Sequence, residues 1–308
     1  MIEYYQKLTA GEGLGRIKTA READIWAHSH ATAQEIDELV TTYDLDRNIV
    51  SDVRDARELP RVEFSGHNLY VFVRNVESGK SCDVSTHPLL AVITPKLYLT
   101  LSPHNTFNPQ RVPAGLVQTT TNPQDLLTAT LATIIADYEQ QVHRTGEMIA
   151  KMRKRLHTRE INNEDFVTFV TIEDDLNDYR TNLSSTLGVI RRLVDNRHKT
   201  FNGQSLEFLE DIALHIEQLL ASVASHAQSA GSIQKVYGTI AKNRLNQRMK
   251  ILTVLTVLLT MPNVFYGMYG MNVPLPYQNE AWVYPAIVLF TFGLILVVLL
   301  LAKRFRLF

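Results

Sequence analysis

Charged residues are almost absent from the last 58 positions of this 308-residue chain. The sequence holds 31 basic and 32 acidic residues, and only four of them follow Lys250: Glu280, Lys303, Arg304 and Arg306. Two uncharged stretches of 22 residues result, 251–272 and 281–302. As a helix, each spans roughly 33 Å, enough to cross a hydrocarbon core of about 30 Å. We therefore predict two transmembrane helices rather than two core helices, which seldom exceed about 14 uncharged residues.

Basic residues lie at the outer ends of this pair of spans. Lys250 precedes the first span and the tail 303–308 has three basic residues, whereas the connecting loop 273–280 has none. By the positive-inside tendency, both chain termini are expected in the cytoplasm. Tyr277 and Trp282 suit an aromatic belt at the outer interface. The sequence thus predicts a multi-pass protein of the cell membrane, in contact with the lipid bilayer, whose first 250 residues are cytoplasmic.

The composition argues against several other classes of protein. A formal net charge of −1 gives no support for nucleic-acid binding, which usually needs a basic excess. The single cysteine, Cys82, can form neither an internal disulfide nor a thiolate metal cage. Segment 79–81 reads as a hairpin turn rather than a phosphate loop, and Gly11, Gly13 and Gly15 as a loop. The sequence has no recognisable arrangement of catalytic residues, so we do not expect an enzyme.

The first 120 residues mix helix and strand signals. Thr32 and Glu35 have capping-box spacing and open an amphipathic helix over 32–44. Alternating apolar residues predict strands over 69–76, 88–94 and 97–101. Residues 1–120 are therefore expected to form a cytoplasmic α/β domain.

Long helices are predicted for residues 121–250. One helix begins at Asn122 and runs for about 35 residues, and a second covers 163–198. A third begins near Ser205, and no proline interrupts it before Pro262. It can therefore continue into the first span without a break, which makes a stalk of roughly 70 Å up to Lys250. The fold class is thus an α/β domain, a long helical stalk and two carboxyl-terminal spans.

Eight residues of the stalk end and first span are separated alternately by three and four positions, which places them along one line of a helix. This polar stripe consists of Asn246, Met249, Thr253, Thr256, Thr260, Asn263, Gly267 and Gly270. An unpartnered amide such as that of Asn263 costs on the order of a few kcal/mol in hydrocarbon, so the stripe must face something other than lipid. One interpretation is helix packing, in which small and hydroxylated residues are common. The other is a water-filled pore, which two spans per chain can enclose only in a homo-oligomer.

The first span ends in Tyr269-Gly270-Met271-Asn272, followed by a short loop, a second span and a basic terminus. In this motif and in the layout of the whole chain, the sequence resembles the CorA family of magnesium channels, whose signature is Gly-Met-Asn at the outer mouth. The resemblance implies a homopentameric funnel with a cytoplasmic α/β domain, long helices and a pore lined by the first span. It also implies that divalent cations are the partners, Mg²⁺ above all, with Co²⁺ and Ni²⁺ as further cargo.

The resemblance carries over to individual residues. Gly270, Met271 and Asn272 match the ion-selectivity motif at the entrance. Met249 and Leu252 match an apolar constriction near the cytoplasmic end, and Asn246 matches a polar ring just below it. Thr260 and Asn263 depart from the family pattern because they are more polar than an apolar gate. The outer loop 273–280 departs from it too, with Glu280 as its only acid.

The spans contain no Asp or Glu, so no carboxylate can replace the water of Mg²⁺, which dehydrates reluctantly. We expect outer-sphere recognition of a hydrated ion by Asn272 and passive uptake driven by the membrane potential. In the family, acidic residues sense intracellular Mg²⁺, so Mg²⁺ is expected as regulator as well as cargo. The candidate regulatory residues are Asp83, Glu210 and Asp211.

Electrostatic contacts near the membrane are a further hypothesis. The second long helix starts with a cluster of acids: Glu164, Asp165, Glu173, Asp174, Asp175 and Asp178. Because this helix should run antiparallel to the stalk, its start is expected to face the basic tail of Lys303, Arg304 and Arg306. The alternative is a solvated acidic surface.

Two other functions remain open. Zinc transporters of the same superfamily share the layout but usually carry Gly-Ile-Asn, so Met271 favours the magnesium branch. A membrane-tethered oligomeric scaffold would need the stalk and the spans but no pore.

Overall fold

The structure is a computed structural model, and it describes residues 2–7, 14–17, 25–77, 85–95, 97–103, 106–113, 115–117, 119–155, 163–197, 199–274, 277 and 280–304. The chain divides into two compact units, Met1–Ser232 and Ile233–Phe308. Helix α5, Gly203–Tyr269, is continuous and contributes to both units.

The first unit is built on one mixed sheet with the strand order β2-β1-β3-β7-β6-β5-β4. The central pair β3 and β7 is parallel, with Trp26 opposite Tyr98, and all other pairs are antiparallel. Strands β4 and β5 are joined by a two-residue turn that starts at Gly66, whose φ of 59° explains why glycine is suited there. The strands are β1 Glu3–Gln6, β2 Gly15–Ile17, β3 Trp26–Ser29, β4 Arg61–Ser65, β5 Asn68–Val76, β6 Thr86–Ile93 and β7 Tyr98–Leu101.

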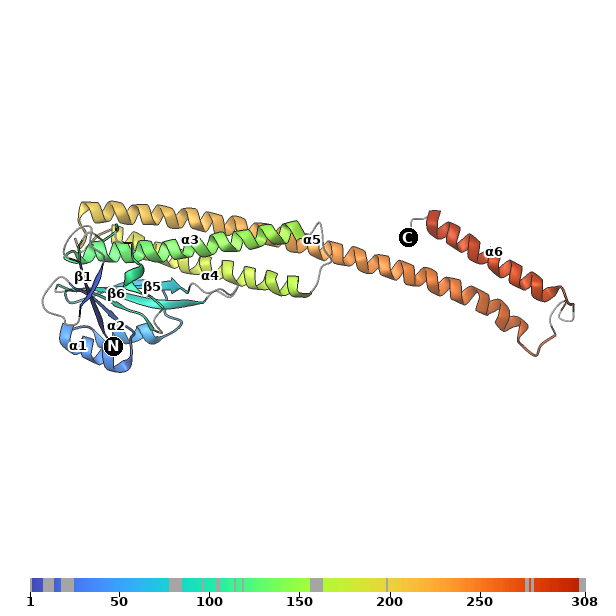
Figure 1. Ribbon diagram of the computed structural model, residues 1–308, viewed down its shortest axis with the longest axis horizontal. Helices are drawn as coiled ribbons and strands as arrows, with labels where there is room; N and C mark the ends of the chain where they lie inside the picture. Colours follow the sequence, from blue (N-terminus) through green and yellow to red (C-terminus); the bar gives the residue numbers. More distant parts are fainter. Residues whose placement is uncertain are drawn as a thin grey trace. The chain divides into compact units, whose positions relative to one another are not determined.

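Helices cover both faces of this sheet (Figure 1). On one face, α1 (Ala33–Tyr43), α2 (Arg47–Ser51) and η1 (Asp52–Arg54) pack against Tyr70, Phe72 and their neighbours in one buried cluster. On the other face lie α3 (Pro123–Arg155) and α4 (Asn163–Val194), with the Tyr98 hydroxyl 2.9 Å from Thr130 on α3. Successive strand residues point to opposite faces, so both faces need apolar side chains, and the central strands β3 and β7 are buried throughout.

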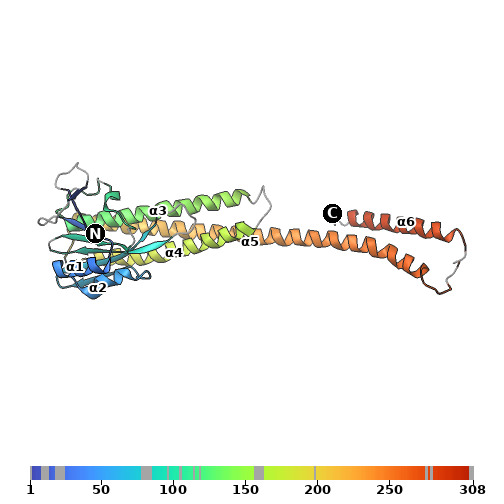
Figure 2. The same cartoon turned by 60° about the horizontal axis from the view of Figure 1, so that its bottom comes forward.

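Three long helices run side by side in the first unit (Figure 2). Helix α5 starts beside the start of α3, where the Ser205 hydroxyl donates to Asp125 at 3.1 Å. Helix α4 meets α5 through Arg191 and Glu217, 2.7 Å apart. The buried residues of α5 in this unit repeat every three or four positions, as a helix covered on one side requires. They include Leu209, Ile212, Ile216, Leu219 and Val223.

Most of the elements expected from the sequence are confirmed. Helix α1 begins where the capping signal placed it, with the Thr32 side chain accepting from the Glu35 backbone N–H at 3.3 Å. Strands β5, β6 and β7 match the three predicted strands within two residues. Helix α5 begins two residues before Ser205 and continues through Pro262 for 67 residues, as expected.

Other expectations were wrong in detail. The second long helix ends at Val194 rather than 198, because Asn196 adopts a left-handed conformation, with φ 43°. The Asn196 side chain then holds the turn by two hydrogen bonds to the backbone of Phe201. Gly15 belongs to strand β2 rather than to a loop, whereas Gly11, Gly13 and segment 79–81 lie outside the described residues.

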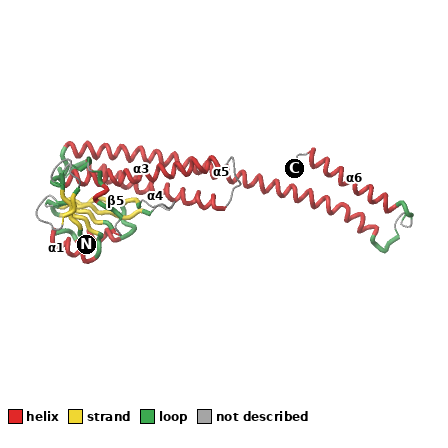
Figure 3. Tube along the Cα trace, in the orientation of Figure 1, coloured by secondary structure: helices red, strands yellow, loops and turns green. Residues whose placement is uncertain are grey.

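The second unit contains the rest of α5 and helix α6, Val283–Arg304, shown as helix in Figure 3. Both α5 and α6 contain stretches long and apolar enough to cross a membrane. They contact each other through the rings of Phe265 and Phe290, whose centroids are 5.2 Å apart in an edge-to-face arrangement.

Candidate functional site

One side of the α5 span is partly covered in the second unit. Val254 is buried, and the other covered residues follow it at helical spacing: Val257, Leu258, Pro262 and Phe265 are half-buried. On α6, Val283, Thr291 and Ala302 are buried, and Phe290 contacts Phe265 of α5. This covered side, which includes Phe265, faces α6, whereas the other apolar side chains of the span are exposed on the single chain.

The polar stripe lies on the opposite side of α5. At about 100° per residue, its mean direction is roughly 150° from that of the covered residues. All eight of its residues are exposed. Helix α6 therefore leaves the whole stripe open.

The three threonines of the stripe satisfy their hydroxyl donors within the helix. Thr253 donates to the carbonyl of Met249 at 2.9 Å, Thr256 to that of Leu252 at 2.9 Å, and Thr260 to that of Thr256 at 2.7 Å. Because each hydroxyl hydrogen is used in this way, the oxygen presents lone pairs to its surroundings. Such an oxygen can accept a hydrogen bond from water.

The side-chain amides of Asn246 and Asn263 form no such hydrogen bond within the helix. Neither side chain forms a hydrogen bond to any described residue. Asn263 lies in the middle of the span, where an unsatisfied amide facing lipid would cost several kcal/mol. This residue, more than the threonines, requires water or another chain on the stripe side.

The motif residues follow directly after the end of α5. The Gly270 N–H donates to the carbonyl of Tyr266 at 3.0 Å, and that of Met271 to the carbonyl of Met268 at 3.3 Å. A Cβ on Gly270 would lie 3.2 Å from the Tyr266 oxygen, a contact that glycine avoids. Gly270 is therefore the first residue beyond the helix, rather than its last stripe position as the spacing suggested.

Asn272 and Met271 are exposed in this turn. The Asn272 amide makes no hydrogen bond within the described part of the chain, so both its oxygen and its nitrogen can bind an external group. At the other end of the stripe, Met249 and Leu252 are exposed to 53% and 55%. Polar and apolar residues of the expected pathway are thus all accessible on the single chain.

Comparison with known proteins decides the family. The family model described as CorA-like Mg²⁺ transporter protein matches residues 22–304. The chain belongs to this family. The expectation drawn from the Gly-Met-Asn motif is thereby confirmed, and so is the fold class of an α/β domain, a long helix and two candidate spans. Among curated proteins, none matches the chain.

Solved structures share the fold over 78% to 99% of the chain. The CorA magnesium transporter from Methanocaldococcus jannaschii has a TM-score of 0.82 at 18% identity, and the match covers 99% of this chain and 98% of that one. Full-length CmaX has a TM-score of 0.74 at 12% identity, with 96% and 97% covered. The ZntB cytoplasmic domain from Vibrio parahaemolyticus RIMD 2210633 has a TM-score of 0.62 at 9% identity, with 78% and 98% covered.

Two of the three regulatory candidates of this CorA-family chain lie within the described residues. Glu210 and Asp211 are exposed on α5, and Asp83 lies outside the described residues. Asp211 lines a cavity of about 270 Å³ together with Asp125 and Glu207. Even so, no group of three His, Cys, Asp or Glu side chains within the described ranges is placed to hold a metal ion.

The acidic start of α4 is not one surface. Glu173, Asp174 and Asp178 are exposed, but Asp175 is buried, with only 4% of its surface accessible. Asp175 therefore does not belong to a solvated acidic patch. The side chain of Glu164 is outside the described residues, as is Arg306, while Lys303 and Arg304 are exposed at the end of α6.

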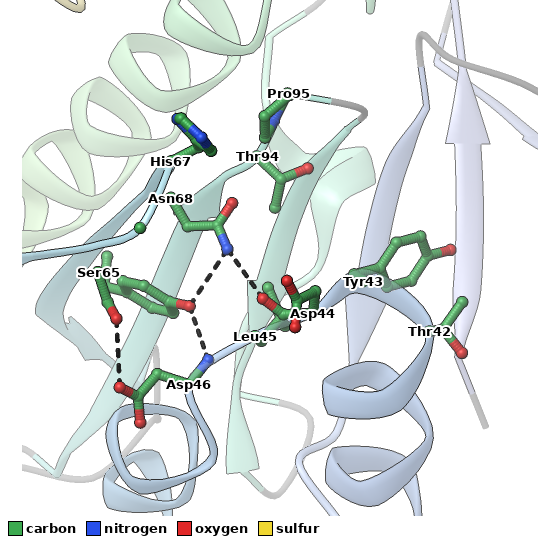
Figure 4. A pocket seen from close by; sticks show the side chains of 12 residues that line it. Thr42, Tyr43, Asp44, Leu45, Asp46, Ser65, His67, Asn68, Thr94 and Pro95 are labelled. Carbon is green, nitrogen blue, oxygen red and sulfur yellow. Dashed lines mark hydrogen bonds between the residues drawn. The ribbon is translucent and has the colours of Figure 1, made fainter.

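A cavity of about 460 Å³ lies in the first unit, between the end of α1 and the β4–β5 turn (Figure 4). Its polar groups largely bond to one another. The Tyr70 hydroxyl accepts from the Asp46 N–H at 2.9 Å, Asn68 donates to the Asp44 carbonyl at 3.2 Å, and Ser65 donates to Asp46 at 3.3 Å. We interpret these contacts as bracing the α1–α2 junction against the sheet.

A buried histidine on β3 was not expected from the sequence. His28 is almost completely buried, and its Nδ1 lies 3.0 Å from the hydroxyl of Thr100. Burial, together with neighbouring His30, lowers the pKa of His28 to about 4, although Glu3 and Glu35 oppose the shift. His28 is therefore neutral at physiological pH and serves the core rather than the ion pathway.

Proposed function

We propose that this chain forms a homopentameric pore for passive uptake of hydrated Mg²⁺, lined by the polar stripe of the first span. The single observation that carries this proposal is that α6 contacts the side of α5 that carries Phe265, opposite the stripe, and leaves all eight stripe residues exposed. Membership of the CorA-like Mg²⁺ transporter family supports the cargo.

A pore lined by the stripe needs several copies of the chain. One helix presents the stripe to lipid, where the Asn263 amide would be unpaired. Copies arranged around an axis turn their stripes toward one another and exclude lipid from them. The number five follows from the family resemblance. The contact with the lipid bilayer is proposed from the two uncharged spans, and the orientation with both termini in the cytoplasm from the positive-inside tendency.

The chemistry of the stripe suits an ion that keeps its water. Mg²⁺ prefers hard oxygen ligands and holds its hydration shell tightly. Water bound to a cation donates hydrogen bonds outward, and the oxygens of Thr253, Thr256 and Thr260 accept them, since their own hydrogens are already used. Asn272 is proposed to select the hydrated ion at the entrance beside Gly270 and Met271.

Uptake needs no other energy source than the membrane potential. A divalent ion gains about 4.6 kcal/mol per 100 mV of inside-negative potential, twice the value for a single charge. Met249 and Leu252 are proposed to close the cytoplasmic end by excluding water from an apolar ring. Regulation by intracellular Mg²⁺ through Asp83, Glu210 and Asp211 stays a prediction, as does the contact of the acidic start of α4 with the basic tail.

The test is Mg²⁺ uptake by liposomes that contain the purified full-length protein, measured with an internal dye under an inside-negative potential. We expect uptake by the wild type and at least a tenfold loss in Asn272→Ala, with Asn243→Ala, an exposed asparagine of α5 away from the motif, as the matched control. Wild-type vesicles without uptake would favour a membrane-tethered scaffold. Uptake unchanged in Asn272→Ala would remove the assignment of the entrance.

Zn²⁺ is the second candidate for the cargo, because the fold of the cytoplasmic region also resembles that of the ZntB domain. Competition in the same vesicles separates the two ions. Excess Zn²⁺ that suppresses Mg²⁺ uptake and itself accumulates would favour zinc transport, whereas block by Co²⁺ or Ni²⁺ alone would keep the magnesium assignment.

A further inference from the structure

The cytoplasmic continuation of the stripe is basic. Between Glu217 and Glu280 the chain has no acidic residue at all. The same segment has five basic residues: Lys235, Lys242, Arg244, Arg248 and Lys250. A helix that leads cations into the cell would be expected to have acids near the exit, so this distribution requires an explanation.

Two of the five basic residues lie on the line of the stripe. The alternation of four and three residues continues backward from Met249 through Asn246 to Lys242, and from there through Thr239 to Lys235. Lys242 and Lys235 are thus one and two heptads before Met249 and are on the same side of α5. All of these residues belong to the second unit.

The arginines lie on another side of the helix. At about 100° per residue, Arg244 and Arg248 point roughly 160° and 120° away from Lys242. That side suits contact with lipid phosphates close to the membrane, as the positive-inside tendency predicts. The lysines of the stripe line and the arginines therefore face different surroundings.

Both lysines are free to act on a passing ion. Lys235 and Lys242 are exposed, and within the described part of the chain neither forms an ion pair. Because none of the 17 residues before Lys235 is acidic, nor any residue after it up to Glu280, no carboxylate of the same helix segment neutralises them. Their charge remains available at the cytoplasmic end of the pathway.

We propose that Lys242 and Lys235 form two electropositive rings in the assembled channel, which lower the rate at which divalent cations pass its cytoplasmic mouth. This inference rests on the proposed oligomeric pore. Repulsion scales with the charge of the ion, so a divalent cation is slowed more than a monovalent one. Lys242 and Lys235 are therefore residues that set the conductance, whereas Asn272 sets the selectivity.

The size of the effect follows from Coulomb's law. Five unit charges about 10 Å from a divalent ion, screened over a Debye length of about 8 Å, change its local concentration on the order of fivefold. Replacing Lys242 by glutamine should raise Mg²⁺ uptake by about this factor at physiological ionic strength. The factor should grow at low salt and vanish near 1 M salt, where the Debye length is about 3 Å.

The experiment measures initial Mg²⁺ uptake by liposomes with full-length Lys242→Gln and Lys235→Gln/Lys242→Gln at several ionic strengths. Arg248→Gln is the matched control, because it removes the same charge near the membrane from another side of the helix. We expect faster uptake in the lysine variants, faster still in the double variant, and no change in the control. Lys242→Arg, which keeps the charge, should restore the wild-type rate.

Different outcomes separate the two proposals. Wild-type vesicles without Mg²⁺ uptake would refute the pore itself. Wild-type uptake that Lys242→Gln leaves unchanged at low salt would refute the lysine rings while the pore stands. An equal increase in Arg248→Gln, or an increase that does not depend on ionic strength, would also refute them. Size-exclusion chromatography with each variant verifies that the oligomer is intact.

Discussion

Threonines occur in the same local geometry in both units, but with opposite surroundings. On α3, the hydroxyls of Thr130 and Thr133 donate to carbonyls four residues earlier, and both side chains are buried in the first unit. On α5, Thr256 and Thr260 make the same bond and are exposed. The bond to the helix satisfies the hydroxyl donor in either setting, so a threonine by itself does not indicate water.

The difference lies in what covers the helix. On α3, the Thr130 oxygen also accepts from the Tyr98 hydroxyl at 2.9 Å, so the sheet supplies a donor to this oxygen. No side chain of the described chain does this for Thr256. Together with the unpaired amide of Asn263, this leaves one side of the span in need of a polar environment.

The largest effect is expected at Asn263. Asn263→Leu should lower Mg²⁺ uptake at least tenfold, because it places an apolar ring in the middle of the proposed pore, where water is then excluded. Asn263→Ser, which keeps a polar group, should retain most of the uptake. The measurement is dye-based flux in liposomes. If the leucine variant transports as well as the wild type, the stripe packs dry and our interpretation of the span is wrong.

Threonine-to-valine substitutions sharpen the comparison directly. Thr256→Val should reduce uptake several-fold because the acceptor oxygen is lost. Thr291→Val on α6 is the matched control, since its hydroxyl donates to Ile287 at 2.8 Å but the side chain is buried. Equal loss of uptake in Thr256→Val and Thr291→Val would contradict the assignment.

Thr130→Val should leave transport intact and destabilise the first unit by about 1–2 kcal/mol, because the Tyr98 hydroxyl loses its acceptor.

We expect the stability of the first unit to depend on pH, and we expect no such dependence from the residues of the stripe. The pKa of His28 in the folded chain, about 4, is below the usual value of 6.5, so the unfolded chain binds the proton first as the pH falls. The free energy of unfolding should therefore fall between about pH 6.5 and 4, by at most ~1.4 kcal/mol per pH unit. Urea titrations in detergent, followed by Trp26 fluorescence in a Trp282→Phe background, measure this slope. A slope no smaller in His28→Gln than in the wild type would assign it to other groups.

The smallest effect is expected for the exposed ion pair between α4 and α5. Arg191 and Glu217 are accessible to 65% and 47%, so water screens their attraction. Arg191→Gln should change the stability of the first unit by under about 1 kcal/mol and leave uptake unchanged. Thermal unfolding and flux of the same preparation check both statements. A loss of several kcal/mol would mean that this contact holds the bundle together.

The sequence alone determined the features that depend on local periodicity and composition. Two uncharged stretches predicted the spans, and the absence of proline before Pro262 predicted one helix through stalk and membrane. The Gly-Met-Asn motif indicated the family that the comparison confirmed. These features repeat along the chain or lie within a few residues, so no tertiary contact is needed to recognise them.

Only the tertiary structure decided which polar residues are covered. Strand β3 was not predicted from the sequence, because His28 and Ser29 interrupt its apolar pattern. Both residues are nevertheless buried in the structure. Asp175 was grouped with surface acids for the same reason. The residues of the stripe could be identified from their spacing. Which side of α5 faces α6, however, depends on contacts between residues of two different helices. Periodicity gives the faces of a helix, and packing decides which face each partner occupies.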